Sequence, residues 1–142
     1  MALEFAAESW LETHTADLYE PSSCLPLANA ADGRFLLPTG SLVSQLTTDF
    51  LAGGTTAELA YRFHTCLAGQ ILSGCQQAAA DTGVYTVALS GGVFQNQLLL
   101  KLCTKALLNN GFQVLLHSLI PPNDGGIALG QALAAIQTLQ AQ

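Results

Sequence analysis

The stretch from Val84 to Gly130 decides the fold. It begins with VYTVALSGGVFQN (Val84–Asn96) and ends with IPPNDGGIALG (Ile120–Gly130). In each half, an apolar run typical of a buried strand leads to two adjacent glycines and then to a helical pattern. This β-α-β-α order predicts a parallel sheet with right-handed crossovers. Helix N-termini present unpaired N–H groups and partial positive charge, so the ends of these strands are expected to hold a phosphate or another anion.

Composition and charge exclude several classes of protein. The chain has 142 residues, of which 50% are hydrophobic and 10% charged, so it is long and apolar enough for one globular domain. Its net charge of −6 argues against nucleic-acid binding, which depends on neutralising phosphates. No apolar run approaches the ~18 residues of a membrane span, and the acidic N-terminus does not match a signal peptide. The low charge indicates that some apolar surface meets a partner chain or another domain.

The cysteines lie far apart in the sequence and form no C-x-x-C pair. They are Cys24, Cys66, Cys75 and Cys103. This spacing disfavours a zinc site or a disulfide framework and favours small buried thiols. A reducing, cytoplasmic location is therefore expected.

Periodicity predicts the remaining elements. Helices are expected at Ala2–Thr13, Ser41–Leu51, Phe94–Asn109 and Gly125–Leu139, and from a capping box at Thr55 and Glu58 to about Ala80. Strands are expected at Arg34–Leu37, Val84–Leu89 and Phe112–Leu116, with a weaker indication at Cys24–Leu27; Gly40 should separate the first of these from the following helix. The nearly all-apolar Val84–Leu89 favours an interior strand covered on both faces. The first helix should bury Leu3, Ala7 and Trp10 with Glu4 elsewhere on the wheel, and the last should turn Leu129, Leu133 and Ile136 inward.

Ser90-Gly91-Gly92 and the following turn are the first candidate site. Glycines allow a ligand to approach the main chain and allow a sharp turn out of the strand. A tight turn with no ligand explains them equally well, because neither a G-x-G-x-x-G nor a P-loop pattern is present. Asn96 can either point its carboxamide at a ligand over the glycines or cap local main-chain amides.

Asp124 is the second candidate. It follows Pro121-Pro122 and precedes Gly125-Gly126. The carboxylate can cap the last helix, or it can bind a metal ion or a metal-bound phosphate. The pattern alone favours the cap.

The histidines His14, His64 and His117 are scattered, and none lies at metal-ligand spacing from another. His64 is expected to be a hydrogen-bonded structural residue. No base is expected to pair with Ser90, so a Ser–His–Asp arrangement is not predicted.

Three segments carry a family resemblance. YRFHT (Tyr61–Thr65), VALSGGVFQN (Val87–Asn96) and PPNDGGIALGQA (Pro121–Ala132) resemble the C-terminal end of the HypF family, the carbamoyltransferases of nickel–iron hydrogenase maturation. The resemblance is strong over residues 55–142 and weak over residues 1–54. It implies that residues 1–142 form a single lobe, the distal half of an α/β domain with the actin-like ATPase (sugar kinase–Hsp70) fold.

The resemblance also implies an activity and a set of site residues. The family uses carbamoyl phosphate and ATP, through a carbamoyl-adenylate, to carbamoylate the C-terminal cysteine of HypE for hydrogenase cyanide-ligand synthesis. Gly91 and Gly92 would line the adenylate phosphate, Asn96 would touch the nucleotide or the carbamoyl end, and Asp124 would bind a divalent metal (iron, magnesium or zinc) with Asn123 beside it. The resemblance thus favours the metal role of Asp124 over the cap. Further metal ligands and the ribose contact are expected upstream of residue 1, so that upstream domains would be partners and the isolated chain would be inactive.

Two rival functions stay open at this point. One is a lobe of an actin-like sugar or acyl kinase. The other is a non-catalytic interaction module that docks a partner through its exposed face. No individual residue is predicted to be catalytic.

Overall fold

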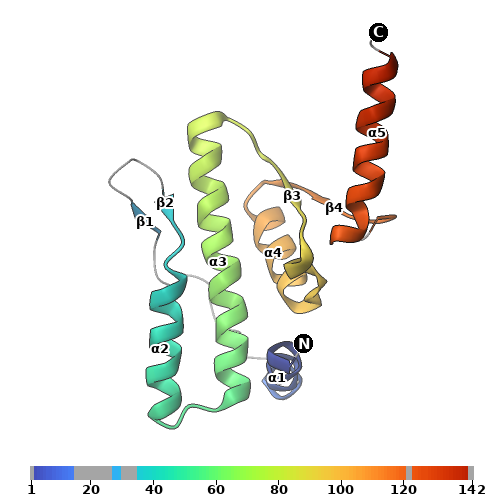
Figure 1. Cartoon of the computed structure of the whole chain (residues 1–142). Helices are drawn as coiled ribbons and strands as arrows, with labels where there is room; N and C mark the ends of the chain where they lie inside the picture. The colour runs from blue at the N-terminus through green and yellow to red at the C-terminus, as the bar shows by residue number, and fades with distance from the viewer. Residues whose placement is uncertain (1, 15–26, 30–34, 121–122, 141–142) are drawn as a thin grey trace.

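The computed structural model describes residues 2–14, 27–29, 35–120 and 123–140 (Figure 1). Its α-helices are α1 (Ala2–Thr13), α2 (Thr39–Leu51), α3 (Thr56–Thr82), α4 (Gln97–Asn109) and α5 (Ile127–Gln140). Its strands are β1 (Ala28–Asn29), β2 (Phe35–Leu36), β3 (Thr86–Leu89) and β4 (Gln113–Leu116). Short 3-10 helices, η2 (Gly92–Gln95) and η3 (Asp124–Gly126), precede α4 and α5. In the described part of the chain, no helix is long and apolar enough to cross a membrane.

The unit β3–α4–β4 confirms the predicted strand–helix–strand order. β3 and β4 pair in parallel, with Thr86 opposite Gln113 and Leu89 opposite Leu116. The α4 helix connects them and packs beside the longer α3 (Figure 1). The core between these elements is apolar and includes Leu89, Leu99, Cys103, Leu107 and Phe112.

A second apolar cluster attaches α1 to α3 and α4. Ala7 is fully buried in it, together with Ala60, Tyr61 and Leu98. Trp10 stacks on Tyr61, with ring centroids 4.7 Å apart. The predicted bounds of α1 are confirmed, but Leu3 is 45% exposed whereas Glu4 faces inward at 9%. The expectation that Glu4 lies away from the core was wrong, because its carboxylate has a specific partner on α4.

Local signals set the ends of α3 as the sequence predicts. The Thr55 side chain accepts a hydrogen bond from the Glu58 amide at 3.3 Å, which satisfies one of the free N–H groups of the first turn. The helix ends two residues beyond the predicted Ala80, at Thr82. Gly83 then takes a left-handed conformation (φ +72°), and its amide donates to the Ala79 carbonyl.

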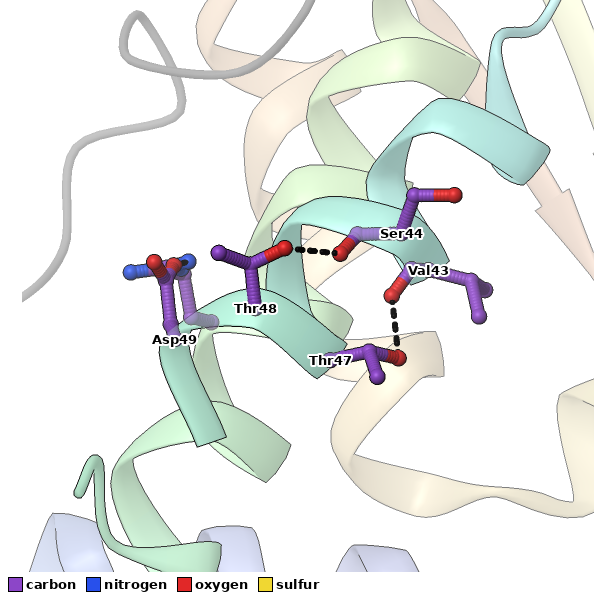
Figure 2. A network of polar contacts seen from close by, with 6 residues as sticks. Val43, Ser44, Thr47, Thr48 and Asp49 are labelled. Carbon is purple, nitrogen blue, oxygen red and sulfur yellow. Dashed lines mark hydrogen bonds and ion pairs between the residues drawn. The ribbon is translucent and has the colours of Figure 1, made fainter. Parts of the chain in front are cut away.

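The α2 helix begins at Thr39, so Gly40 lies in its first turn and does not separate it from the strand as predicted. Figure 2 shows Thr47 and Thr48 donating from their hydroxyls to the carbonyls of Val43 and Ser44, at 2.8 and 3.0 Å. These bonds satisfy polar groups on the outer side of α2. An ion pair between Asp49 and Arg62 ties α2 to α3.

The small sheet before α2 is antiparallel. β1 pairs with β2, with Ala28 opposite Leu36. The strand predicted at Arg34–Leu37 is confirmed over Phe35–Leu36, and Arg34 lies outside the described residues. Most of the strand proposed at Cys24–Leu27 also lies outside them, while Leu27 precedes β1.

Two expectations about burial were wrong. The strand predicted at Val84–Leu89 is not covered on both faces: β3 itself begins at Thr86, and Leu89 is its only buried residue. Val84 and Tyr85, which precede β3, are 58% and 54% exposed. The α5 helix buries none of its residues, and Leu129, Leu133 and Ile136 are all more than half exposed. In Figure 1, α5 extends away from the other helices. Within the described residues, no element buries Leu129, Leu133 or Ile136, so the inward face predicted for this helix is not present.

Candidate functional site

The ends of β3 and β4 lie side by side. The Gly91-Gly92 turn follows β3 directly, whereas η3, with Gly125-Gly126, begins eight residues after the end of β4. Leu89 and Leu116 are the last paired residues of the two strands. Ser90 and His117 follow them, and Ser90 Oγ lies 2.8 Å from His117 Nε2. The expectation that no base pairs with Ser90 was therefore wrong. Sequence reasoning missed the pair because 27 residues separate its members, and only the parallel register brings them together.

The turn at Gly91-Gly92 leaves its main chain open. Gly91 has φ +100°, a conformation that residues with a side chain rarely adopt. A Cβ built at either glycine would meet no atom within 4 Å. The space beside both glycines is therefore open to a ligand. Contact with a phosphate stays a prediction.

The helix predicted from Phe94 to Asn109 is divided in two. Gly92–Gln95 forms η2, Asn96 is extended, and α4 starts at Gln97. Asn96 caps α4, since its Oδ1 accepts from the Leu99 amide at 2.8 Å. The structure therefore shows the local cap, one of the two alternatives for this side chain. The ligand contact of Asn96 stays a prediction.

The other end of the Asn96 carboxamide is held by His64. The His64 side chain is 1% exposed, and its Nδ1 lies 2.7 Å from the Ala60 carbonyl. A carbonyl only accepts, so Nδ1 carries the proton and Nε2 is free to accept. Nε2 lies 2.8 Å from Asn96 Nδ2, which therefore donates to it. His64 is a structural histidine, as the sequence predicts, and it fixes the residue that ends η2.

Glu4 occupies the N-terminus of α4. Its Oε1 accepts from the Gln97 amide at 2.6 Å and lies 3.3 Å from the Leu98 amide. A carboxylate is favoured there by the free N–H groups and by the helix dipole. Together, Glu4 and Asn96 satisfy the amides of residues 97–99. The anion expected at this helix N-terminus is therefore the Glu4 carboxylate from α1. The remaining place for a phosphate is the Gly91-Gly92 turn.

The second loop has a different cap from the one expected. Asn123 is the N-cap of η3, and its Oδ1 accepts from the Gly125 amide at 3.0 Å. Asp124 is the first residue of η3 and is exposed. The prediction that Asp124 caps the last helix was wrong: a 3-10 turn precedes α5, and Asn123 caps that turn. Within the part of the chain that the structure describes, no hydrogen bond or ion pair engages the Asp124 carboxylate.

A cavity of about 320 Å³ lies at the same strand ends. Leucine and phenylalanine side chains form most of its wall, and its polar lining residues are Gln95, Gln97 and His117. His117 thus belongs both to the cavity and to the contact with Ser90.

The described residues do not form a metal site by themselves. No group of three or more His, Cys, Asp or Glu side chains among them is arranged to hold a metal ion. Asp124 is one hard oxygen donor, whereas hard divalent cations take six or more ligands. Among the described residues, Asp124 is therefore a single candidate ligand, and metal binding stays a prediction.

Comparison with known proteins gives a consistent result. The family model described as “Carbamoyltransferase, Kae1-like Domain, second subdomain” matches residues 1–131. The carbamoyltransferase HypF of Synechocystis sp. is 40% identical over 99 residues, which are 70% of this chain and 12% of that protein. A HypF homolog of Cupriavidus necator is 33% identical over 137 residues, covering 95% of this chain and 33% of that protein.

A solved structure of full-length HypF in a phosphate- and nucleotide-bound form superposes on this chain with a TM-score of 0.74 and 30% sequence identity. The match covers 86% of this chain and 16% of that one. The chain therefore spans a third or less of the length of these relatives.

Proposed function

The chain belongs to the HypF carbamoyltransferase family, in the second subdomain of its Kae1-like domain, and we propose that it works as one lobe of a longer carbamoyltransferase. The reaction proposed is transfer of a carbamoyl group, made from carbamoyl phosphate and ATP through a carbamoyl-adenylate, to the C-terminal cysteine of HypE in the cytoplasm. The observation that carries this proposal is the adjacent placement of the two strand ends, with the Gly91-Gly92 turn directly after β3.

The glycine turn would hold the phosphate of the adenylate. Gly91 and Gly92 leave open space beside their main chain, so a phosphate oxygen can come close to their N–H groups. Amide donors at this position would stabilise negative charge as the carbamoyl group leaves the phosphate for sulfur. The HypF structure that this chain matches is described as phosphate- and nucleotide-bound, which supports a phosphate ligand for the longer protein.

Asn96 would act mainly by holding this turn in place. Its two hydrogen bonds, to the Leu99 amide and to His64, fix the point where η2 ends. A ligand over the glycines can still donate a hydrogen bond to the Asn96 carboxamide oxygen, which has a second lone pair. Because both ends of the Asn96 carboxamide are hydrogen-bonded, the turn has its conformation before the ligand binds. Binding would then cost no conformational entropy for ordering the turn.

Asp124 would supply one ligand to a divalent metal, with Asn123 fixing the loop. The other ligands would come from outside the described residues. The metal, when bound, would offset the charge of the phosphate.

The upstream part of the same protein would cover the apolar face of α5. Leu129, Leu133, Ile136 and Leu139 are 51–70% exposed, and a patch of this kind on a helix marks a surface meant for contact. The upstream domains are therefore proposed partners.

The test is the substitution Asp124→Ala in the full-length enzyme. Asn123 provides the cap, so the fold should lose less than ~1 kcal/mol, the usual value of a carboxylate near a helix N-terminus. Carbamoylation of a C-terminal cysteine, followed by mass spectrometry, should be lost. Glu12→Ala removes an exposed carboxylate on α1, outside both glycine loops, and serves as the control. Transfer at the normal rate by the Asp124 variant would refute the metal role, and failure of the wild-type protein to transfer carbamoyl would refute the proposed reaction.

A further inference from the structure

We propose that Ser90 and His117 form a positioning pair that fixes the glycine turn after β3 relative to the Asn123–Asp124 loop after β4. The inference rests on the proposed function, since it assumes that these two loops hold the same reacting group. It assigns a role to two residues for which the sequence predicts none.

The position of the pair in the chain suits this role. Ser90 directly precedes Gly91, so its side chain fixes the last point of β3 before the turn changes direction. His117 is the first residue after β4, at the start of the segment that leads to Asn123. Nε2 of His117 lies 2.8 Å from Ser90 Oγ. The contact is therefore the first one between the two segments beyond the strand ladder.

The chemistry of the pair tolerates either neutral tautomer of His117. If Nδ1 carries the proton, Nε2 accepts from the Ser90 hydroxyl; if Nε2 carries it, Nε2 donates to the oxygen. In both cases the distance is kept, and in the second the hydroxyl hydrogen is free to turn toward a ligand over the glycines. The same imidazole lines the 320 Å³ cavity, so the pair lies beside space that a substrate can fill.

A second side-chain hydrogen bond between β3 and β4 provides a control for the Ser90–His117 contact. At the other end of the same two strands, Thr86 Oγ1 donates to Gln113 Oε1 at 3.3 Å, and their residue numbers again differ by 27. Thr86 and Gln113 are directly opposite in the ladder. Both contacts join β3 to β4, but only the Ser90–His117 contact is next to the glycine loops. Any effect that comes merely from holding the strands together should appear at both ends.

The experiment measures carbamoyl transfer by the full-length enzyme with Ser90→Ala, His117→Ala and the double variant, against Thr86→Ala and Gln113→Ala. Loss of alignment between two loops should lower kcat by about 10- to 100-fold, since misplacement of ~1 Å has effects of this size. KM for ATP should stay within about twofold, because the glycine turn itself is intact. The double variant should be no slower than the slower single variant, as expected for two residues that act only through one another.

The conservative variant His117→Gln gives a further readout. Its amide keeps a hydrogen-bonding group for Ser90 and should restore part of kcat, whereas His117→Phe should not. Urea midpoints of all variants show whether the fold is intact.

Three results would overturn the inference while wild-type transfer remains normal. The first is full kcat in Ser90→Ala. The second is an equal loss in the Thr86 and Gln113 variants. The third is additive losses in the double variant. Absence of transfer in the wild-type enzyme would instead count against the proposed function.

Discussion

The Glu4–α4 contact gives a prediction whose size can be worked out from the structure. The substitution Glu4→Ala removes the acceptor of the Gln97 amide at 2.6 Å and of the Leu98 amide at 3.3 Å. A buried N–H left without a partner costs about 1–3 kcal/mol, and the short bond dominates here. Loss of a carboxylate at a helix N-terminus adds about 0.3–1 kcal/mol. We expect the free energy of unfolding to fall by roughly 2–4 kcal/mol.

The variant Glu4→Gln separates the two contributions. It keeps an oxygen acceptor at nearly the same place and loses only the charge, so the loss should be about 1–2 kcal/mol, the difference between hydrogen bonds to charged and to neutral groups. Glu12→Ala makes the same change in net charge at an exposed position of the same helix. It should stay within about 0.5 kcal/mol of the wild type.

Urea unfolding followed by tryptophan fluorescence is the assay. Trp10 is the single tryptophan of the chain and stacks on Tyr61 at the contact between α1 and α3, so its emission reports the docking of α1. With a slope of about 1–3 kcal/mol/M, the Glu4→Ala midpoint should shift by roughly 1–2 M. If Glu4→Ala and Glu12→Ala unfold at the same urea concentration, Glu4 does not stabilise the start of α4 and the reasoning fails.

The other predictions concern a thiol, the glycine turn and an ion pair. Burial, helped by the nearby Cys75, raises the pKa of the Cys103 thiol from 9.0 to about 12. Iodoacetamide at pH 8 should therefore label Cys103 only after unfolding, and rapid labelling of the folded chain would contradict this. The free energy of unfolding should also fall as the pH rises from 9 toward 12, because the unfolded chain loses the thiol proton first. Gly91→Ala should destabilise the fold by about 1–2 kcal/mol because of its positive φ, whereas Gly92→Ala should not, and thermal unfolding of the two variants compares them directly. Asp49→Asn should cost under about 1 kcal/mol, and the difference from wild type should shrink in 0.5 M salt; a difference that persists there would argue against a screened ion pair with Arg62.

Local sequence signals predicted the local structure well. The helix at Ala2–Thr13, the Thr55 cap and the parallel β3–β4 pair all follow from short patterns, because each depends on neighbouring residues or on a single crossover. The boundary at Asn96 was missed, since a 3-10 turn and an α-helix share similar apolar spacing over a few residues.

Contacts between distant segments could not be predicted. Glu4 has the same charge as Glu12, and nothing in its neighbours marks it as the partner of an amide 93 residues away. Burial on α5 was wrong for a related reason. The apolar spacing indicates a face that needs a partner, but it does not say whether that partner lies within the described residues.

The long separation between Glu4 and Gln97 has a consequence for the order of folding. Closing the chain between Glu4 and Gln97 is entropically more costly than closing it between the ends of β3 and β4, by about 1 kcal/mol if both are flexible chains. The contact of Trp10 with Tyr61, which also docks α1, spans a shorter stretch and costs roughly 0.5 kcal/mol more than the strand pair. We therefore expect the β3–α4–β4 unit to form first and α1 to dock later. A late-docking helix is also the first to detach in the native state. Detachment of α1 would release the first turn of α4, so hydrogen exchange at the amides of Gln97 and Leu98 should follow the opening of a helix at the far end of the sequence.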